Sequence, residues 1–399
     1  MFKRMQSMQM QAVHCFQTIS PEQHEYRAII ALHNTHLGPA LGGCRCLTYA
    51  HEQLAFDDVM RLAQGMSYKA ALANVPQGGG KAVILLPNNV DADKINRQFL
   101  FSWFGQCVAQ LNGQYITAMD VGTQVADMDV VAEQTCHVAS ASNIGDPADA
   151  TAEGVMKGIQ AALDFHCNSL AKTDGSTDKN TTKDLAIAEE CFFDKTFAIQ
   201  GLGHVGWRVA QALVRFGGKV VAADPDEEKC KQAQTLGIEI VSTDEILTQS
   251  CDVLVPCALG GIIHANNVNE LRCKIIAGSA NNQLAAEGIA EVLTQRNILY
   301  APDYVINAGG LIFASLQYHA KNQLLENKSD HVKQKINQQV NESISQKINE
   351  IYATLIAIFK QAKSSGNNIN EVANELALQR LNAPVDMNTV SKGDVYDAA

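Results

Sequence analysis

Two lysines, Lys69 and Lys81, are the residues of this sequence best suited to proton transfer. Three consecutive glycines at 78–80 precede Lys81, and an apolar run, AVILLP, follows it. Glycine runs forgo side-chain packing, so they indicate a backbone that must approach another group closely. We therefore predict a loop at 78–80, with Lys81 at the mouth of a buried strand. Desolvation and a second lysine nearby both disfavour an ammonium ion, and a lysine so placed becomes a proton acceptor near neutral pH. A solvated loop with an ordinary surface lysine is the alternative.

A carboxylate suited to the same chemistry is Asp120. It follows a predicted strand at 115–119 and precedes Gly122. A carboxylate at the end of a strand, entering a glycine-containing loop, is commonly presented to a cleft. The alternative is that Asp120 only caps a helix or forms a turn.

The segment GLGHVG at 201–206 predicts a dinucleotide-binding turn, because it lies between a predicted strand and a predicted helix. Gly201 would make the tight turn, Gly203 would let the backbone reach a pyrophosphate, and Gly206 would let helix and strand pack closely. The N-terminus of the helix offers free N–H groups and the positive end of its dipole to the phosphates. A purely structural glycine turn is the alternative.

The acid that completes this motif is Asp224, 18 residues after Gly206 and at the end of a predicted strand over 219–223. Asp224 would accept hydrogen bonds from the adenosine ribose and repel a 2′-phosphate, which favours NAD over NADP. Further strands are predicted at 252–256, 274–277 and 298–300. Their carboxyl ends should meet at one edge of a parallel sheet, where ligands bind.

The elements that must position these residues alternate between strands and helices. Apolar patterns predict a strand at 27–33, a glycine-rich loop at 37–43, helices at 56–72, 88–112 and 152–166, and one long amphipathic helix over 332–358. The polar segment 168–190 is predicted to be a solvated insertion. The fold class is therefore α/β, with a substrate domain at 1–150, a Rossmann-type NAD-binding domain at 151–330 and a helical segment at 331–399 that returns to the first domain.

The composition is that of a globular protein whose 399 residues suffice for two domains, with 46% hydrophobic and 18% charged residues. The net charge of −11 and the absence of a basic cluster argue against nucleic acid or an anionic membrane as a partner. The eleven scattered cysteines lack a CxxC pair, which predicts reduced thiols in a cytoplasmic protein without a metal site. We find neither a signal peptide nor a run long enough to cross a membrane.

Several segments, in this order along the chain, resemble those of the Glu/Leu/Phe/Val dehydrogenase family, and particularly its leucine dehydrogenase branch. They are GPALGGCR (38–45), GMSYKAALANVPQGGGKAVI (65–84), ITAMDVGT (116–123), GLGHVG (201–206), PCALGG (256–261), AGSANNQL (277–284) and APDYVINAGG (301–310).

The resemblance implies a role for each candidate residue. Lys69 would hold the substrate α-carboxylate, Lys81 would activate the water that attacks the imine, and Asp120 would be its partner in proton transfer. The remaining substrate contacts implied are Leu41, Gly42, Gly43, Ala118, Asn282, Leu311 and Ala314. The NAD contacts implied are Thr151, Gly201, Gly203, His204, Val205, Gly206, Asp224, Cys257, Ala258, Ala280, Asn281 and Asn307.

The implied reaction is the reversible, NAD-dependent oxidative deamination of an apolar L-amino acid such as leucine, valine or isoleucine. Leu41 stands where glutamate-using members have a lysine, and a charged side chain buried beside it would be unpaired and costly. Phenylalanine or tryptophan stays open as the substrate, because parts of the chain also look like the tryptophan-using relatives. A non-catalytic NAD-binding sensor is the alternative from another class. The resemblance also implies a homo-oligomer.

Overall fold

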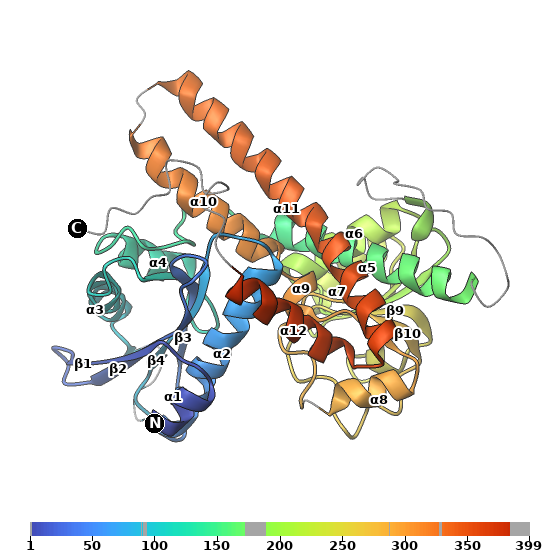
Figure 1. The fold of residues 1–399 in the computed structure, drawn as a ribbon, viewed down its shortest axis with the longest axis horizontal. Coiled ribbons are helices and arrows are strands. Elements are labelled where there is room, and N and C mark those ends of the chain that lie inside the picture. The colour runs from blue at the N-terminus through green and yellow to red at the C-terminus, as the bar shows by residue number, and fades with distance from the viewer. Residues whose placement is uncertain are drawn as a thin grey trace. The chain divides into compact units, whose positions relative to one another are not determined.

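The computed structural model describes residues 2–88, 90, 94–171, 189–286, 288–326 and 329–383. Its contacts divide the chain into two compact units (Figure 1). Unit 1 comprises residues 1–71, 75–138 and 376–399, and unit 2 comprises 72–74 and 139–375. The contacts thus place residues 139–150 with unit 2, whereas the sequence-based boundary lies at 150. Each unit contains a sheet covered by helices, so the predicted two-domain α/β class is confirmed.

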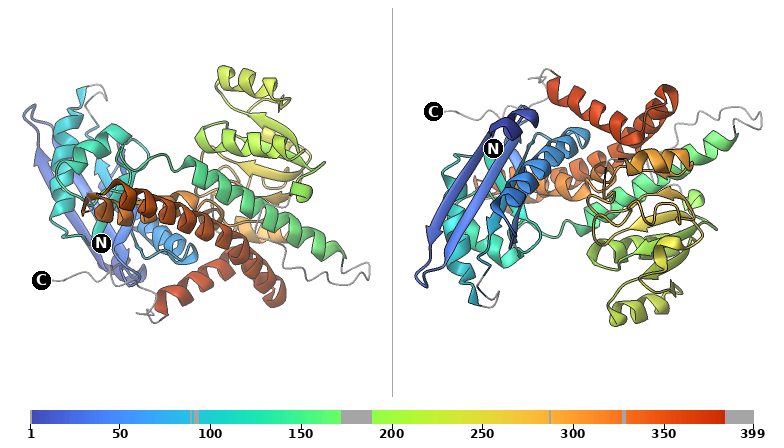
Figure 2. Two further views of the ribbon diagram at one scale, coloured as in Figure 1. Left: turned by 90° about the horizontal axis from the view of Figure 1, so that it is seen from above. Right: turned by 90° about the horizontal axis from the view of Figure 1, so that it is seen from below.

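The sheet of unit 1 has the strand order β1-β2-β4-β3-β5. Its long antiparallel strands β1 (Ala12–Ile19) and β2 (Glu25–Asn34) lie side by side at one edge (Figure 2). Next come β4 (Gly78–Leu85), β3 (Ala40–Leu47) and β5 (Tyr115–Met119), which are mutually parallel. The strands predicted at 27–33 and 115–119 are therefore confirmed.

Residues 40–43 and 78–80 belong to strands, which corrects the loop predicted at 78–80 and most of the one predicted at 37–43; only residues 37–39 form a turn. β3 begins at Ala40 and β4 begins at Gly78, so Lys81 lies inside a strand rather than at its mouth. The reason is close packing within the protein. A Cβ on Gly42 would lie 1.8 Å from the carbonyl oxygen of Gly80 in the neighbouring strand. Gly42, Gly43 and the glycines at 78–80 let strands and helices approach one another, and they are not loop residues.

Helix α2 (Glu52–Leu72) confirms the predicted helix at 56–72 and covers one face of this sheet. Its buried residues Ala55, Val59 and Ala63 pack in one cluster with strand residues including Ala31 and Val83. Further along, the helix approaches β4 so closely that a Cβ on Gly79 would lie 2.0 Å from the backbone nitrogen of Ser67. The hydroxyl of Ser67 also forms a hydrogen bond of 2.8 Å with Nδ1 of His33 on β2.

On the other side of the sheet lie α3 (Arg97–Ala109) and α4 (Val125–Ala132) (Figure 1). Helix α3 is shorter than the helix predicted at 88–112. It begins after Asn96, whose side chain accepts a hydrogen bond from the backbone N–H of Phe99 and so caps the helix. A short helix, α1 (Phe2–Ser7), precedes β1.

The sheet of unit 2 is parallel and has the strand order β11-β10-β9-β6-β7-β8. The sequence predicted five of these strands; β8 (Glu239–Ile240) has only two residues and was missed. The five are β6 (Thr196–Gln200), β7 (Lys219–Ala223), β9 (Cys251–Pro256), β10 (Cys273–Ile276) and β11 (Leu299–Tyr300). The order reverses between β6 and β9, which is the point where open α/β sheets bind ligands.

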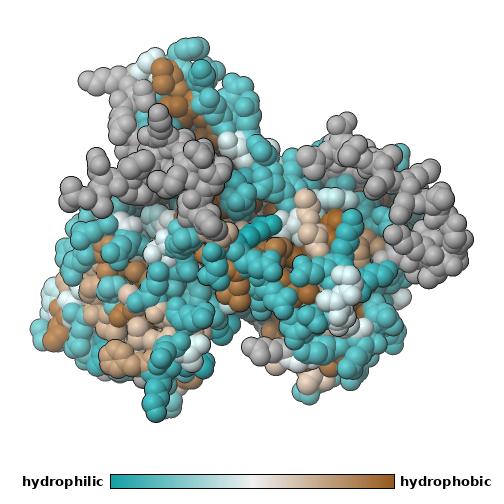
Figure 3. Space-filling view, viewed as in Figure 1, coloured by the Kyte–Doolittle hydropathy of each residue, from teal (hydrophilic) through white to brown (hydrophobic). Residues whose placement is uncertain are grey.

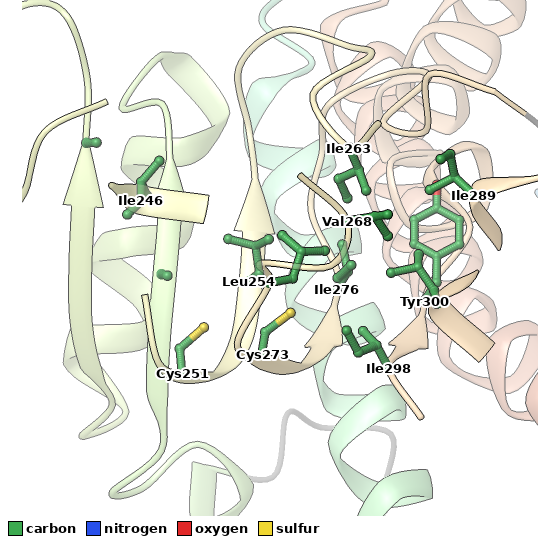
Figure 4. Packing of buried hydrophobic residues seen from close by; sticks show 14 residues of the cluster. Ile246, Cys251, Leu254, Ile263, Val268, Cys273, Ile276, Ile289, Ile298 and Tyr300 are labelled. Carbon is green, nitrogen blue, oxygen red and sulfur yellow. The ribbon is translucent and has the colours of Figure 1, made fainter. Parts of the chain in front are cut away.

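Buried apolar side chains pack against this sheet in one cluster (Figure 4). Leu254 of β9 and Ile276 of β10 lie beside Ile298 and Tyr300 near the edge strand. Around the sheet lie α6 (His204–Arg215), α7 (Glu227–Thr235), α8 (Ile289–Gln295), α9 (Asp303–Ile306) and two short 3-10 turns, η3 (Glu189–Cys191) and η4 (Ile246–Thr248).

Three long helices complete unit 2. Helix α5 (Ala148–Ala171) is longer than the helix predicted at 152–166, so part of the predicted insertion is helical; residues 172–188 lie outside the described part. Helix α11 (Asp330–Ser365) confirms the predicted long helix and packs on α5 and α10 (Gly309–Glu326) (Figure 2). A hydrophobic stripe lies over the outer ends of α10 and α11 (Figure 3). Val332, in the first turn of α11, is 38% exposed. The last helix, α12 (Ile369–Asn382), contains the chain division at 375/376.

Among the described residues, no helix is long and apolar enough to cross a membrane.

The contact of α2 with β4 predicts opposite effects for two glycine substitutions. Gly79→Ala should lower the free energy of unfolding by roughly 2–3 kcal/mol, because the new methyl group would overlap the backbone of Ser67. Gly65 lies on α2 itself, and nothing lies within 4 Å of its Cβ position. Gly65→Ala should therefore raise the free energy of unfolding by roughly 0.5–1 kcal/mol, since alanine favours the helix. Denaturant titration measures both, and equal effects would contradict the packing argument.

Candidate active site

One face of the unit 1 sheet gathers most of the predicted unit 1 residues. Leu41 pairs with Gly79 on one side and with Ile116 on the other, and Gly43 pairs with Ala118. Because directly paired residues project to the same face, Leu41, Gly43 and Ala118 share the face on which α2 packs. Leu41 is almost fully buried there, whereas Ala118 is only partly buried.

On this face the ammonium of Lys81 forms an ion pair with Oδ2 of Asp120. Gly43 makes room for the pair: a Cβ at that position would lie 2.7 Å from Cβ of Asp120 and 3.2 Å from Nζ of Lys81. The side chain of Lys81 is only 8% exposed and that of Asp120 is 19% exposed. The structure therefore brings together two residues that are 39 positions apart in the sequence.

Sequence reasoning missed a third member of this group, Arg45. Its Nε donates to Oδ2 of Asp120 at 3.1 Å, and its Nη1 donates to Oδ2 of Asp58 at 2.9 Å. Asp58 also accepts a hydrogen bond of 2.9 Å from the hydroxyl of Tyr49. The available indication was strand alternation, which puts Arg45 on the same face as Gly43.

The charges around Asp120 settle its ionisation state. Burial alone would raise the pKa of the Asp120 carboxyl, but the ammonium of Lys81 and the guanidinium of Arg45 together lower this pKa below its usual range. Attraction to two cations outweighs desolvation, so Asp120 is a carboxylate at neutral pH. It can therefore accept a proton.

The loop after Asp120 is held on both sides. The hydroxyl of Thr123 accepts a hydrogen bond of 2.8 Å from the backbone N–H of Asp120. Gly122 has φ +81° and packs where a Cβ would lie 2.0 Å from the carbonyl oxygen of Cys46. Arg97 donates to the carbonyl of Gly122 at 3.0 Å and holds Asp127 with two further bonds. These contacts fix the backbone of Asp120 and the following loop relative to β3.

Lys69 lies in the last turn of α2, two residues after Ser67, which contacts Gly79. The turn that carries Lys69 therefore lies over the strand that carries Lys81. Arg380 of α12 holds the end of this helix by donating to the carbonyl of Ala71 at 3.2 Å. The other predicted substrate contacts, Asn282, Leu311 and Ala314, belong to unit 2.

In unit 2 the glycines of the 201–206 turn have the expected geometry. Gly201 has φ +94°, and its Cβ position lies 2.8 Å from Cβ of Ala258, at the end of β9. A Cβ on Gly206 would lie 2.0 Å from the carbonyl oxygen of Gly201 and 3.0 Å from Cβ of Cys257. Gly203, in contrast, has nothing within 4 Å of its Cβ position. Its backbone faces open space at the N-terminus of α6, as a pyrophosphate site requires.

Helix α6, which confirms the helix predicted after the glycine turn, begins at His204, so His204 and Val205 lie in its first turn. Backbone N–H groups in the first turn have no partner within the helix, and they can serve anion binding. Arg208 of the same helix pairs with Asp149, and with Asp146 at 3.1 Å.

Asp224 lies at the end of β7, as predicted, and its carboxylate is tied to the turn. Oδ2 accepts a hydrogen bond of 2.7 Å from the backbone N–H of Leu202, and Oδ1 accepts one of 2.9 Å from that of Asp226. A carboxylate has about four acceptor positions, so both oxygens can still accept from a ribose.

The ends of β9 and β10 place the other predicted NAD contacts close together. The backbone N–H of Cys257 donates to Gln200 of β6 at 2.7 Å, and that of Ala280 donates to Pro256 at 2.9 Å. Asn307 donates from Nδ2 to Oδ1 of Asn281 at 2.8 Å, while its own Oδ1 is buried without a hydrogen-bond partner. An unpaired amide oxygen at this edge can accept from the carboxamide of a nicotinamide.

Thr151 lies near the start of α5, where its hydroxyl donates to the carbonyl of Pro147 at 2.9 Å. A Cβ on Gly310 would lie 2.8 Å from that hydroxyl, and one on Gly309 would lie 2.0 Å from the carbonyl oxygen of Ala150. The segment 307–310 and the start of α5 thus pack together within unit 2.

A glycine turn with Asp224 at the reversal point of a parallel sheet defines unit 2 as a dinucleotide-binding domain. Comparison with known proteins identifies the family. Residues 9–137 match "Glu/Leu/Phe/Val dehydrogenase, dimerisation domain", and residues 225–385 match "Glutamate/Leucine/Phenylalanine/Valine dehydrogenase". Residues 162–277 match "D-isomer specific 2-hydroxyacid dehydrogenase, NAD binding domain".

Three relatives span nearly the whole chain. Leucine dehydrogenase of Thermoactinomyces intermedius is 37% identical over 360 residues, covering 89% of this chain and 87% of that protein. Phenylalanine dehydrogenase of Caldalkalibacillus thermarum is 36% identical over 378 residues, covering 92% and 91%. The crystal structure of L-tryptophan dehydrogenase from Nostoc punctiforme matches with a TM-score of 0.74 and 34% identity, covering 96% and 98%. The chain belongs to the Glu/Leu/Phe/Val dehydrogenase family and is an amino-acid dehydrogenase whose cofactor is NAD.

The contacts of Asp224 suggest how to test the coenzyme preference. Asp224→Asn keeps an oxygen for the N–H of Leu202 but removes the charge, so the ratio of NADP to NAD activity should rise about tenfold or more. Asp226→Asn is the matched control, since asparagine caps α7 as well as aspartate does. Steady-state rates with each coenzyme measure the ratio, and an unchanged ratio for Asp224→Asn would show that the charge does not select the coenzyme.

Proposed function

We propose that this enzyme catalyses the reversible oxidative deamination of an apolar L-amino acid, with leucine, valine or isoleucine as its main substrates. The observation that carries the proposal is the buried ion pair of Lys81 with Asp120 beside Gly43, on a sheet face that also carries Leu41 and Ala118. This arrangement supplies a proton donor and a proton acceptor beside apolar side chains.

In the proposed reaction, bound NAD would supply the acceptor for the hydride that leaves Cα of the substrate. Water then adds to the resulting imine, and loss of ammonia from the adduct gives the 2-oxo acid. Lys69 pairs with the substrate α-carboxylate, which fixes the position of Cα. Lys81 orients the attacking water, and the carboxylate of Asp120 takes up the proton that this step releases. Gly42 and Gly43 keep the strand free of side chains next to the reacting atoms.

The choice of an apolar substrate rests on the side chains that share the sheet face with the ion pair in unit 1. Leu41 and Ala118 carry no charge, so an acidic substrate side chain against them would lose its hydration without gaining a partner. Relatives named for leucine, phenylalanine and tryptophan are similar in identity, 37%, 36% and 34%. Phenylalanine and tryptophan are therefore the second candidates.

A substrate panel tests the proposal directly. Purified protein with NAD should form NADH with L-leucine, L-valine and L-isoleucine, and more slowly with aromatic amino acids. L-glutamate should give a rate at least about tenfold lower, because an unpaired buried carboxylate costs more than 1.4 kcal/mol. Absorbance of NADH measures all rates at one NAD concentration. If neither branched nor aromatic amino acids were turned over, the proposal would fail, and NAD binding without turnover would favour the sensor alternative.

The proposed roles of the two lysines predict different kinetic effects. Lys81→Met should lower kcat roughly 10²–10⁴-fold while leaving NAD affinity unchanged, because it removes the acid–base group but leaves Asp120 paired with Arg45. Lys81→Arg should be nearly as inactive, since a guanidinium keeps the charge but is too large and planar to take the place of the ammonium beside Gly43. Lys69→Met should mainly raise KM for the amino acid.

Titration of intrinsic fluorescence with NADH provides the measure of coenzyme affinity for these variants. Full activity of Lys81→Arg would show that position 81 supplies only charge, and a loss of kcat alone in Lys69→Met would contradict its role in binding.

Two further expectations belong to this proposal. We propose that the enzyme works in the cytoplasm. We also propose that it assembles as a homo-oligomer, because the family's first domain is described as a dimerisation domain. Sedimentation equilibrium of the purified chain tests the assembly.

A further inference from the structure

Arg45 links the proposed acid–base pair to a second carboxylate. Its Nε donates to Asp120 at 3.1 Å, and its Nη1 donates to Asp58 at 2.9 Å. Asp58 in turn accepts from the hydroxyl of Tyr49 at 2.9 Å and pairs with Arg61 at 3.0 Å. The charges alternate along this row, from Lys81 through Asp120, Arg45 and Asp58 to Arg61.

The inner members of the row are shielded from water. The side chains of Arg45 and Asp120 are each 19% exposed and that of Asp58 is 16% exposed, whereas Arg61 at the outer end is 53% exposed. Charges in such surroundings interact more strongly than charges in water. The position and charge of each member therefore depend on its neighbours.

We propose that Arg45 is a positioning residue for the reaction: it holds the carboxylate of Asp120 in the orientation and the ionised state that let it accept a proton beside Lys81, and Asp58 holds Arg45 in turn. This inference rests on the proposed function, because it assigns Arg45 a role through Asp120.

The geometry requires a guanidinium at this position. Arg45 uses Nε for one carboxylate and Nη1 for the other, and the rigid plane of the group fixes both directions at once. A lysine at position 45 would offer a single ammonium on a flexible chain, which cannot hold two separated carboxylates in fixed positions.

Other ionisable groups near Asp120 come from every element packed around it. They are Cys44 of β3, Lys81 of β4, Tyr115 of β5, Asp58 of α2, Asp127 of α4 and the partner of Asp127, Arg97 of α3. Burial raises the pKa of the Cys44 thiol and of the Tyr115 hydroxyl well above their usual values, so neither carries charge near neutral pH. Arg97 and Asp127 offset each other. Lys81 and Arg45 are thus the charges that act directly on Asp120, and Asp58 acts through Arg45.

The arrangement predicts the direction in which each substitution shifts the pKa of Asp120. The two cations lower the pKa of Asp120, so removing the charge of Arg45 should raise this pKa and move the acidic limb of the pH–rate profile to higher pH. Asp58→Asn keeps an acceptor for Arg45 but removes a negative charge. Arg45 then acts on Asp120 without compensation, and the acidic limb should move to lower pH.

The test compares pH profiles of kcat/KM for four variants of the full-length enzyme, with L-leucine and NAD. We expect Arg45→Gln to shift the acidic limb upward by about one pH unit and to lower kcat about tenfold or more, with KM for NAD within twofold of the wild type. In Arg45→Lys the acidic limb should lie at its wild-type position, because the positive charge is kept, but kcat should recover only in part. Asp58→Asn should shift the limb downward, and Tyr49→Phe should leave it within about 0.2 units.

The outcomes are separable. An acidic limb that stays in place in both Arg45→Gln and Asp58→Asn, or moves the same way in both, would overturn the proposal. Asp58→Asn decides the question alone if Arg45→Gln does not fold. Absence of turnover by the wild-type enzyme with every apolar amino acid would instead refute the proposed function, while turnover with an unmoved limb would refute only the role of Arg45.

Discussion

The cost of burying charge is the constraint on which unit 1 depends. Removing an ammonium and a carboxylate from water costs several kcal/mol per ion, and only close pairing with additional hydrogen bonds offsets it. Lys81 and Asp120 meet this condition because Arg45 and the backbone of Val121 donate further hydrogen bonds to the Asp120 carboxylate. A pair held in this way is ionised and fixed before a substrate arrives. It therefore needs little reorganisation during proton transfer.

The glycines of unit 1 follow from the same constraint. The pair fits on the sheet only because Gly43 has no side chain, and β3 can lie beside β4 there only because Gly42 leaves room for the carbonyl of Gly80. Gly79 in turn lets the last turns of α2, with Lys69, approach the strand that carries Lys81. Among the glycines of the 201–206 turn in unit 2, Gly203 faces open space, whereas Gly201 and Gly206 serve packing. One residue type thus performs two tasks, and the surroundings of each glycine distinguish them.

The parts of the structure that could be predicted from sequence are those with local causes. The turn at 201–206 and Asp224 were recognised because strand, glycines, helix and acid follow one another within a short segment. The run at 78–80 was misinterpreted as a loop because groups that it approaches, such as Asn34 and Tyr115, come from distant parts of the chain. Arg45 was missed for the same reason: its partner Asp120 lies 75 residues away. Such contacts depend on strand order, which periodicity does not reveal.

The same reasoning explains why the reaction is easier to infer than the substrate. Lys69, Lys81 and Asp120 would act on the carboxylate, the amine and the water, which are common to all amino-acid substrates, and they do so through charge. The side chain of the substrate would instead meet apolar residues such as Leu41 and Ala118, where a methylene group changes binding by only about 1–3 kcal/mol. The substrate preference within a family can therefore change from leucine to phenylalanine or tryptophan through a few substitutions that alter the shape of the apolar surface. The relatives named for these substrates are accordingly similar to this chain in identity.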